Sequence, residues 1–121
     1  MSITATIHRI EQALTREHAA AESPLTPRQL LALEFISRNE GCSQTDVVEN
    51  TGIDRSTLAD LVRRLVKTGL IARTRSKEDA RAYVLRVTEN GSRALAKAQQ
   101  ARKKAEAKVI EAFPILRGLA A

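Results

Sequence analysis

Two short helical segments joined by a glycine turn constrain the fold of this 121-residue sequence more than any other feature. Ser43 and Asp46 have the spacing of a helix capping box, and the helix that they begin is predicted to end just before Gly52. Asp54 then caps a second helix, predicted from Arg55 to about Thr68. Because glycine permits a sharp reversal between the two helices, the pattern predicts a helix-turn-helix.

The second of these helices is strongly amphipathic. One face is apolar at helical spacing, so it is expected to pack on the preceding helix and to hold the opposite face toward solvent. An α-helix fixed in this way has the right size to enter the major groove of duplex DNA. The apolar face consists of Leu58, Leu61, Val62 and Leu65, and the polar face of Arg55, Ser56, Thr57, Asp60, Arg63, Arg64 and Lys67.

A basic β-hairpin is predicted directly after this helix. Gly69 ends the helix, and residues 70–76 and 82–88 have the composition of two strands, with the tip at Ser76 to Arg81. Arg73, Arg75 and Lys77 in this hairpin are candidates for phosphate contacts. Arg81 is a candidate for the adjacent minor groove, and we expect Asp79 to hold its guanidinium by a charge-assisted hydrogen bond.

Helices are also predicted on both sides of this region. Residues 3–20 form an amphipathic helix, and another begins at Pro27 and continues through Ile36. Thr88 caps a long polar helix from about Gly91 to Ala112. The fold class is therefore α+β and mostly α, a winged helix-turn-helix with additional N- and C-terminal helices.

The distribution of charge indicates a polyanionic partner. The net charge is +6, but residues 1–53 hold 4 Lys and Arg against 7 Asp and Glu, whereas residues 54–121 hold 16 against 7. The positive charge is thus concentrated where the recognition helix and hairpin are predicted. Aromatic residues make up only 2%, too few for the stacking platforms that bind single-stranded nucleic acid, so duplex DNA is the expected partner.

Other classes of function find little support. The sequence has no Ser/His/Asp arrangement, glycine-rich phosphate loop or paired carboxylates, so we expect no enzymatic activity and no cofactor. His8 and His18 lack neighbouring ligands for a metal, and Cys42 is expected to be an inert, partly buried thiol rather than a redox switch. Without a signal peptide or membrane span, the protein is expected in the cytoplasm.

The segment LTPRQLLALEFI, the helix-turn-helix that follows it, and the segments GLIARTRSKEDARA and LRVTENG resemble the MarR family of bacterial transcription regulators. The resemblance covers residues 25 to about 95, although the chain is shorter than typical members and has one proline-interrupted C-terminal helix where the family often has two. It implies a homodimer on a pseudopalindromic operator, usually as a repressor. Residues 1–22 and 89–121 would dimerise and residues 23–88 would bind DNA.

The sequence therefore predicts a sequence-specific regulator that binds double-stranded DNA. A winged helix used for protein contacts and a nonspecific architectural DNA-binding protein remain as alternatives, and the sequence identifies no small-molecule effector. The candidate DNA-binding residues are Ser43, Gln44, Thr45, Arg55, Ser56, Thr57, Asp60, Arg63, Arg64, Arg73, Arg75, Lys77, Asp79 and Arg81.

Overall fold

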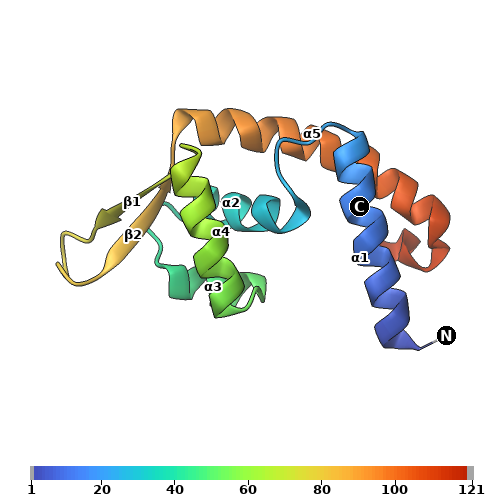
Figure 1. Cartoon of the computed structure of the whole chain (residues 1–121), viewed down its shortest axis with the longest axis horizontal. Helices are drawn as coiled ribbons and strands as arrows, with labels where there is room; N and C mark the ends of the chain where they lie inside the picture. Colours follow the sequence, from blue (N-terminus) through green and yellow to red (C-terminus); the bar gives the residue numbers. More distant parts are fainter. Residues whose placement is uncertain (1, 120–121) are drawn as a thin grey trace. The chain divides into compact units, whose positions relative to one another are not determined.

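The computed structural model describes residues 2–119 and is mostly helical with one two-stranded hairpin (Figure 1). This confirms the fold class expected from the sequence. The elements in chain order are α1 (Ile3–Ala20), α2 (Pro27–Arg38), α3 (Gln44–Thr51), α4 (Arg55–Lys67), β1 (Ile71–Arg75), β2 (Tyr83–Val87), α5 (Glu89–Ala112) and the 3₁₀ helix η1 (Pro114–Leu119).

The chain divides into two compact units. The first combines the N-terminal segment up to Pro27 with the segment from Lys97 onward, and the second is Arg28–Ala96. The second unit therefore contains α2, α3, α4, the hairpin and the first turns of α5.

Within residues 2–119, the structure has no helix that is both long enough and apolar enough to span a membrane.

The core of the second unit forms where the predicted apolar faces meet. The apolar face of α4 is buried as its spacing predicted, and α4 contacts both α3 and β1. Burial of these aliphatic side chains is the main source of stability for the unit, because each contributes roughly 1.5–3 kcal/mol. The most deeply buried side chains are Leu30, Leu33 and Ile36 of α2, Val47 of α3, Val62, Leu58 and Leu65 of α4, and Ile71 and Leu85 of the hairpin.

The predicted capping box and turn of the helix-turn-helix are confirmed. The Asp46 N–H donates to Ser43 Oγ at 3.0 Å, and the Ser43 N–H donates to Asp46 Oδ2 at 2.9 Å. Gly52 has φ +76°, a left-handed conformation that side chains other than glycine adopt with strain. The angle between α3 and α4 is thus set by local sequence.

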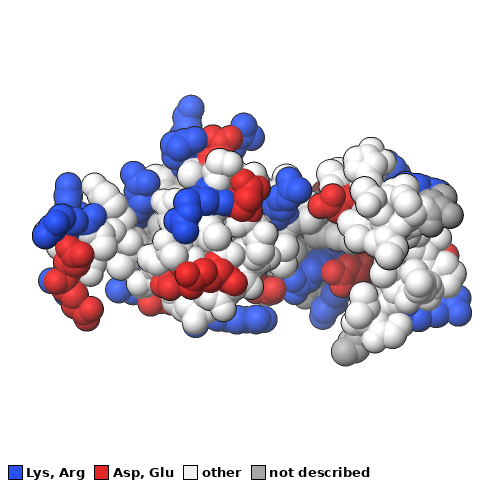
Figure 2. Space-filling view, turned by 90° about the horizontal axis from the view of Figure 1, so that it is seen from below, with Lys and Arg blue, Asp and Glu red and all other residues white. Residues whose placement is uncertain are grey.

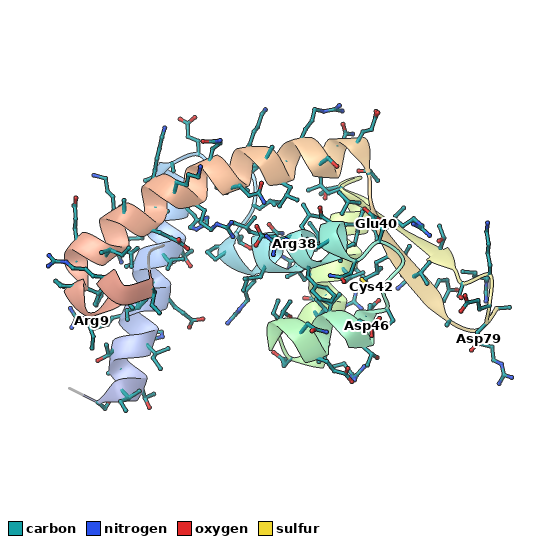
Figure 3. The ribbon with its side chains drawn as sticks, turned by 180° about the vertical axis from the view of Figure 1, so that it is seen from behind. Arg9, Arg38, Glu40, Cys42, Asp46 and Asp79 are labelled. Carbon is teal, nitrogen blue, oxygen red and sulfur yellow. The ribbon has the colours of Figure 1, made fainter. Side chains whose placement is uncertain are left out.

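The base of the hairpin is attached to the loop between α2 and α3, which contains Glu40 and Cys42 (Figure 3). The Gly41 N–H donates to the Leu85 carbonyl at 2.9 Å, and the Leu85 N–H donates to the Cys42 carbonyl at 2.8 Å. The Glu40 carboxylate accepts the Val87 N–H at 3.2 Å. These bonds satisfy backbone groups of an edge strand and hold the base of the hairpin in place.

The start of α5 packs very closely on the turn between α4 and β1. Thr88 caps the helix as predicted, accepting the Gly91 N–H at 3.0 Å, while its own hydroxyl donates to the Gly69 carbonyl at 2.6 Å. A Cβ built on Gly91 would lie 2.0 Å from the Leu70 carbonyl oxygen. The helix begins at Glu89, two residues before the predicted Gly91.

In the first unit, α1 packs against the C-terminal part of α5. The buried side of α5 carries Ala98, Ala101, Ala105 and Val109, small side chains that allow a close approach. His18 of α1 is only 2% exposed, and neither ring nitrogen has a hydrogen-bond partner among the described residues. Burial lowers the pKa of His18, so its ring is neutral in the interior.

Candidate nucleic-acid interface

All fourteen candidate DNA-binding residues lie in the second unit, on α3 and its N-cap Ser43, on α4 and in the hairpin. Ser43, Gln44 and Thr57 are partly buried, and the others are exposed. Figure 2 shows that the end of the molecule bearing the hairpin carries Lys and Arg mixed with Asp and Glu rather than one uniform basic surface. The acidic side chains at this surface therefore need a physical explanation.

At the start of α4, the acidic Asp54 is explained by its role as the cap of the helix. Its carboxylate accepts the Thr57 N–H at 3.1 Å, the Thr57 hydroxyl at 2.6 Å and the Ser56 hydroxyl at 2.9 Å. The hydrogen bonds from Thr57 and Ser56 lower the pKa of Asp54 from 3.8 to about 2. The carboxylate is thus ionised at neutral pH and caps α4.

The acid stability of the protein should reflect this cap. The pKa of Asp54 is lowered on folding, so its contribution to stability is present above pH 4 and disappears as the pH falls toward about 2. Asp54→Asn retains a capping oxygen without a charge. We expect the melting temperature of wild type to exceed that of the variant by less at pH 2.5 than at pH 6. A constant difference across this range would contradict the assignment.

Two further contacts order the exposed face of α4. Arg55 Nη1 donates to Thr45 Oγ1 at 3.2 Å and so links the starts of α4 and α3. Arg63 forms an ion pair with Asp60 at 2.5 Å, with both side chains more than half exposed. An exposed pair of this kind adds little stability, but it places the arginine beside the carboxylate along the helix.

The two arginines of β1 share one aromatic partner. The guanidinium carbons of Arg73 and Arg75 lie 4.8 and 5.2 Å from the centroid of the Tyr83 ring. Tyr83 pairs directly with Arg75 in the antiparallel register, which puts all three side chains on one face of the hairpin. Such cation–π contacts restrict long side chains that would otherwise be mobile.

Tyr83 was absent from the sequence-based candidates, although it supports two of them. Replacing Tyr83 by alanine is expected to weaken DNA binding by about two- to fivefold for each of the two arginines that contacts DNA, because each exposed cation–π contact contributes roughly 0.5–1 kcal/mol to ordering an arginine. Tyr83→Phe keeps the ring and should bind like wild type. Equal losses in both variants would instead assign the effect to the hydroxyl group. Fluorescence anisotropy with a labelled duplex measures all three proteins.

At the tip of the hairpin, Asp79 makes a different contact from the one expected. Its Oδ1 accepts the backbone N–H of Arg81 at 3.0 Å and makes no ion pair with the guanidinium. Short side chains prefer local main-chain donors, and this geometry forms an Asx turn. Ser76 Oγ accepts the Glu78 N–H at 3.2 Å, and Arg75 Nη1 donates to the Ala80 carbonyl. Asp79, at the tip of the hairpin in Figure 3, thus orders the loop backbone, and the Arg81 side chain is exposed.

The cysteine and histidines offer no alternative site in the described part of the chain. Burial and the nearby Asp46 raise the pKa of the Cys42 thiol, which disfavours the reactive thiolate. Among residues 2–119, no group of three or more His, Cys, Asp or Glu side chains is placed to hold a metal ion.

Comparisons with known proteins agree with this geometry. Residues 23–82 match the sequence profile of the MarR family. A protein of Thauera aromatica, named as a transcriptional regulatory protein for the hcr operon, is 38% identical over 77 residues, which are 64% of this chain and 46% of that protein. The chain therefore matches less than half the length of this relative.

Two solved structures extend the likeness across nearly the whole chain. The transcriptional repressor CouR, bound to a 23-mer DNA duplex, superposes with a TM-score of 0.79 and 27% identity over 93% of this chain and 81% of that chain. The PcaV transcriptional regulator from Streptomyces coelicolor, in complex with its natural ligand, gives a TM-score of 0.84 and 25% identity over 99% and 92% of the two chains. The helix-turn-helix, the hairpin and the matched profile together place this chain in the MarR family of winged helix-turn-helix transcriptional regulators.

Proposed function

We propose that this protein is a homodimeric, sequence-specific repressor that binds a pseudopalindromic DNA operator. The observation that carries the proposal is the joint placement of α4 and the hairpin in one compact unit, where α4 contacts β1. Both elements expose arginines, and α4 also exposes short polar side chains near its start. This combination suits a protein that recognises base edges and is positioned on the DNA by phosphate contacts.

Each element has a distinct proposed role. The exposed face of α4 enters the major groove, where Arg63 and Arg64 reach guanine acceptors or the backbone. Arg73, Arg75 and Lys77 of the hairpin pair with flanking phosphates, and Arg81 reaches the adjacent minor groove. Thr45, Ser43 and Gln44 at the start of α3 provide further polar contacts. Residues 23–88 would thus form the DNA-binding region.

Exposed apolar side chains in the first unit support dimerisation. Ile3 and Ile7 of α1 are 79% and 55% exposed, and Ile115 and Leu119 of η1 are 84% and 80% exposed. Exposed aliphatic groups at both ends of the chain would be removed from water in a second copy's interface. We therefore assign residues 1–22 and 89–121 to dimerisation. Two copies would then present two recognition helices to an inverted repeat.

The known relatives support the mode of action. CouR is a transcriptional repressor whose solved structure is bound to a 23-mer DNA duplex, and occupation of an operator by this chain would likewise block transcription. PcaV was solved in complex with its natural ligand, which supports control of this chain by a small molecule. The cytoplasm is the proposed location, in which Cys42 stays reduced.

Selection of bound duplexes from a random library tests the proposal, with the enriched site then titrated at 50 and 200 mM salt. We expect an inverted repeat, with an affinity that falls by roughly 10³- to 10⁵-fold if the dimer contacts about six to ten phosphates. Sedimentation of the complex should give two chains per duplex.

Other outcomes of the same selection point to other functions. Weak binding without enrichment would indicate an architectural DNA-binding protein. No binding even at 50 mM salt would indicate a winged helix that contacts protein.

A further inference from the structure

We propose that Asp54 makes the hydroxyl groups of Ser56 and Thr57 act only as hydrogen-bond acceptors toward DNA. The start of α4 would then favour adenine or cytosine over guanine or thymine at the contacted position, because only adenine and cytosine carry an amino group in the major groove. This inference rests on the proposed function, because it concerns what the recognition helix reads.

The two hydroxyl groups have only one hydrogen each, and Asp54 takes both. Ser56 Oγ lies 2.9 Å from Asp54 Oδ2, and Thr57 Oγ1 lies 2.6 Å from Asp54 Oδ1. An ionised carboxylate has no hydrogen to donate, so in each pair the hydroxyl must be the donor. The remaining lone pairs of both oxygens are free to accept.

The donor and acceptor pattern of DNA then decides which groups can approach. Phosphate oxygens, guanine N7 and O6, and thymine O4 are all acceptors, and an acceptor-only hydroxyl cannot pair with them. Adenine N6 and cytosine N4 carry the major-groove hydrogens that it can receive. The two hydroxyl groups at the start of α4 can therefore accept hydrogen bonds only from the amino groups of adenine and cytosine.

The charge of Asp54 adds a second restriction. A helix N-terminus ordinarily attracts phosphate through its free N–H groups. Here the exposed Asp54 carboxylate already accepts the Thr57 N–H and places a negative charge at that end of α4. A phosphate at this position would be repelled, which leaves base edges as the groups that the two hydroxyls can contact.

Farther along α4 the hydrogen-bonding character reverses. Asp60, one turn beyond Ser56 and Thr57, is also an acceptor, whereas Arg63 and Arg64 are donors only. Apart from Arg55, which donates to Thr45 of α3, the exposed polar side chains in the first turns of α4 are thus acceptors, and the following turn carries donors suited to guanine or phosphate. This polarity predicts an order of bases within each half-site.

Base analogues without the amino group test the inference on the selected duplex. Each adenine is replaced in turn by purine and each cytosine by 2-pyrimidinone, and binding is measured for wild type and for the double variant Ser56→Ala with Thr57→Val. In wild type, at least one substitution per half-site should lower the affinity by roughly five- to tenfold. In the double variant the same substitution should have no effect, because the accepting oxygens are gone.

Two single variants sharpen the test. Asp54→Asn keeps the cap, but its amide can donate to a hydroxyl and so free a hydroxyl hydrogen for DNA. Repeating the selection with this variant should shift the preference at the same positions toward thymine or guanine. Thr68→Val removes an exposed hydroxyl that donates to the Arg64 carbonyl at the opposite end of α4, where no candidate DNA contact was placed on the threonine, and it should bind like wild type.

The outcomes separate this inference from the proposed function. If wild type enriches an operator but every amino-group deletion has equal effects in wild type and in the double variant, the inference is wrong and the function stands. An unchanged preference in Asp54→Asn would also overturn it. If wild type binds no duplex selectively, the proposed function fails, and the inference fails with it.

Discussion

Gly91→Ala is expected to destabilise the second unit by at least about 3 kcal/mol, the upper part of the range for overpacking. The added Cβ would lie 2.0 Å from the Leu70 carbonyl oxygen and 2.8 Å from Val87 Cγ1, and backbone cannot move aside as a flexible side chain can. Relief would require α5 to separate from the turn, which would strain the hydrogen bond from Thr88 to the Gly69 carbonyl. Alanine favours a helix by about 1 kcal/mol, so the clash outweighs this gain.

Urea unfolding followed by circular dichroism measures the Gly91→Ala effect. Gly118→Ala is the matched control, because a Cβ there meets no atom within 4 Å and its φ is not in the left-handed region. This control should change stability by less than about 0.5 kcal/mol. A Gly91→Ala protein as stable as wild type would mean that α5 does not begin against the α4–β1 turn as described.

Arg81→Ala is expected to weaken binding to the selected operator by about 1–3 kcal/mol, which is roughly 5- to 150-fold. Arg81 is exposed at the hairpin tip, and its guanidinium makes no hydrogen bond or ion pair with any described residue. Its backbone N–H is held by Asp79, so the loop is ordered before DNA arrives and less entropy is lost on binding.

A charge-matched variant distinguishes a groove contact from a general electrostatic effect. Arg38→Ala removes one positive charge from the exposed end of α2, where Arg38 pairs with Glu34 at 3.9 Å. It should reduce the affinity by much less than Arg81→Ala when both are measured at 150 mM salt. Similar losses in the two variants would remove the hairpin tip from the interface.

The helix-turn-helix could be predicted from the sequence because its signals are local. The capping box at Ser43, the left-handed Gly52 and the apolar spacing of α4 each act over one or two turns of helix. The same holds for Thr88 as the cap of α5. Each of these features was found where the sequence placed it.

The features that the sequence did not reveal depend on contacts between distant segments. The contact of two arginines with Tyr83 could be identified only once the hairpin register was known. It is this register that pairs Tyr83 with Arg75. The close approach at Gly91 depends on how α5 meets the α4–β1 turn. His18 was considered only as a metal ligand, and its burial results from the packing of α1 with α5.

The contact of Asp79 shows a different reason why the sequence did not predict a side-chain contact. Sequence spacing correctly put Asp79 beside Arg81 at the hairpin tip, but it did not determine which group of Arg81 the carboxylate would bind. A backbone N–H two residues away is held at a fixed distance, whereas the guanidinium must lose side-chain entropy to reach the same oxygen. The local contact is therefore favoured over the ion pair.

Footprinting of both grooves on the selected operator tests most directly whether α4 and the hairpin bind DNA together. Dimethyl sulfate reports guanine N7 in the major groove, and hydroxyl radicals report access to the minor-groove side of the backbone. We predict major-groove protection in each half-site with minor-groove protection beside it, and Arg81→Ala should lose only the latter. Protection of neither groove, or equal protection on an unrelated duplex, would contradict the account.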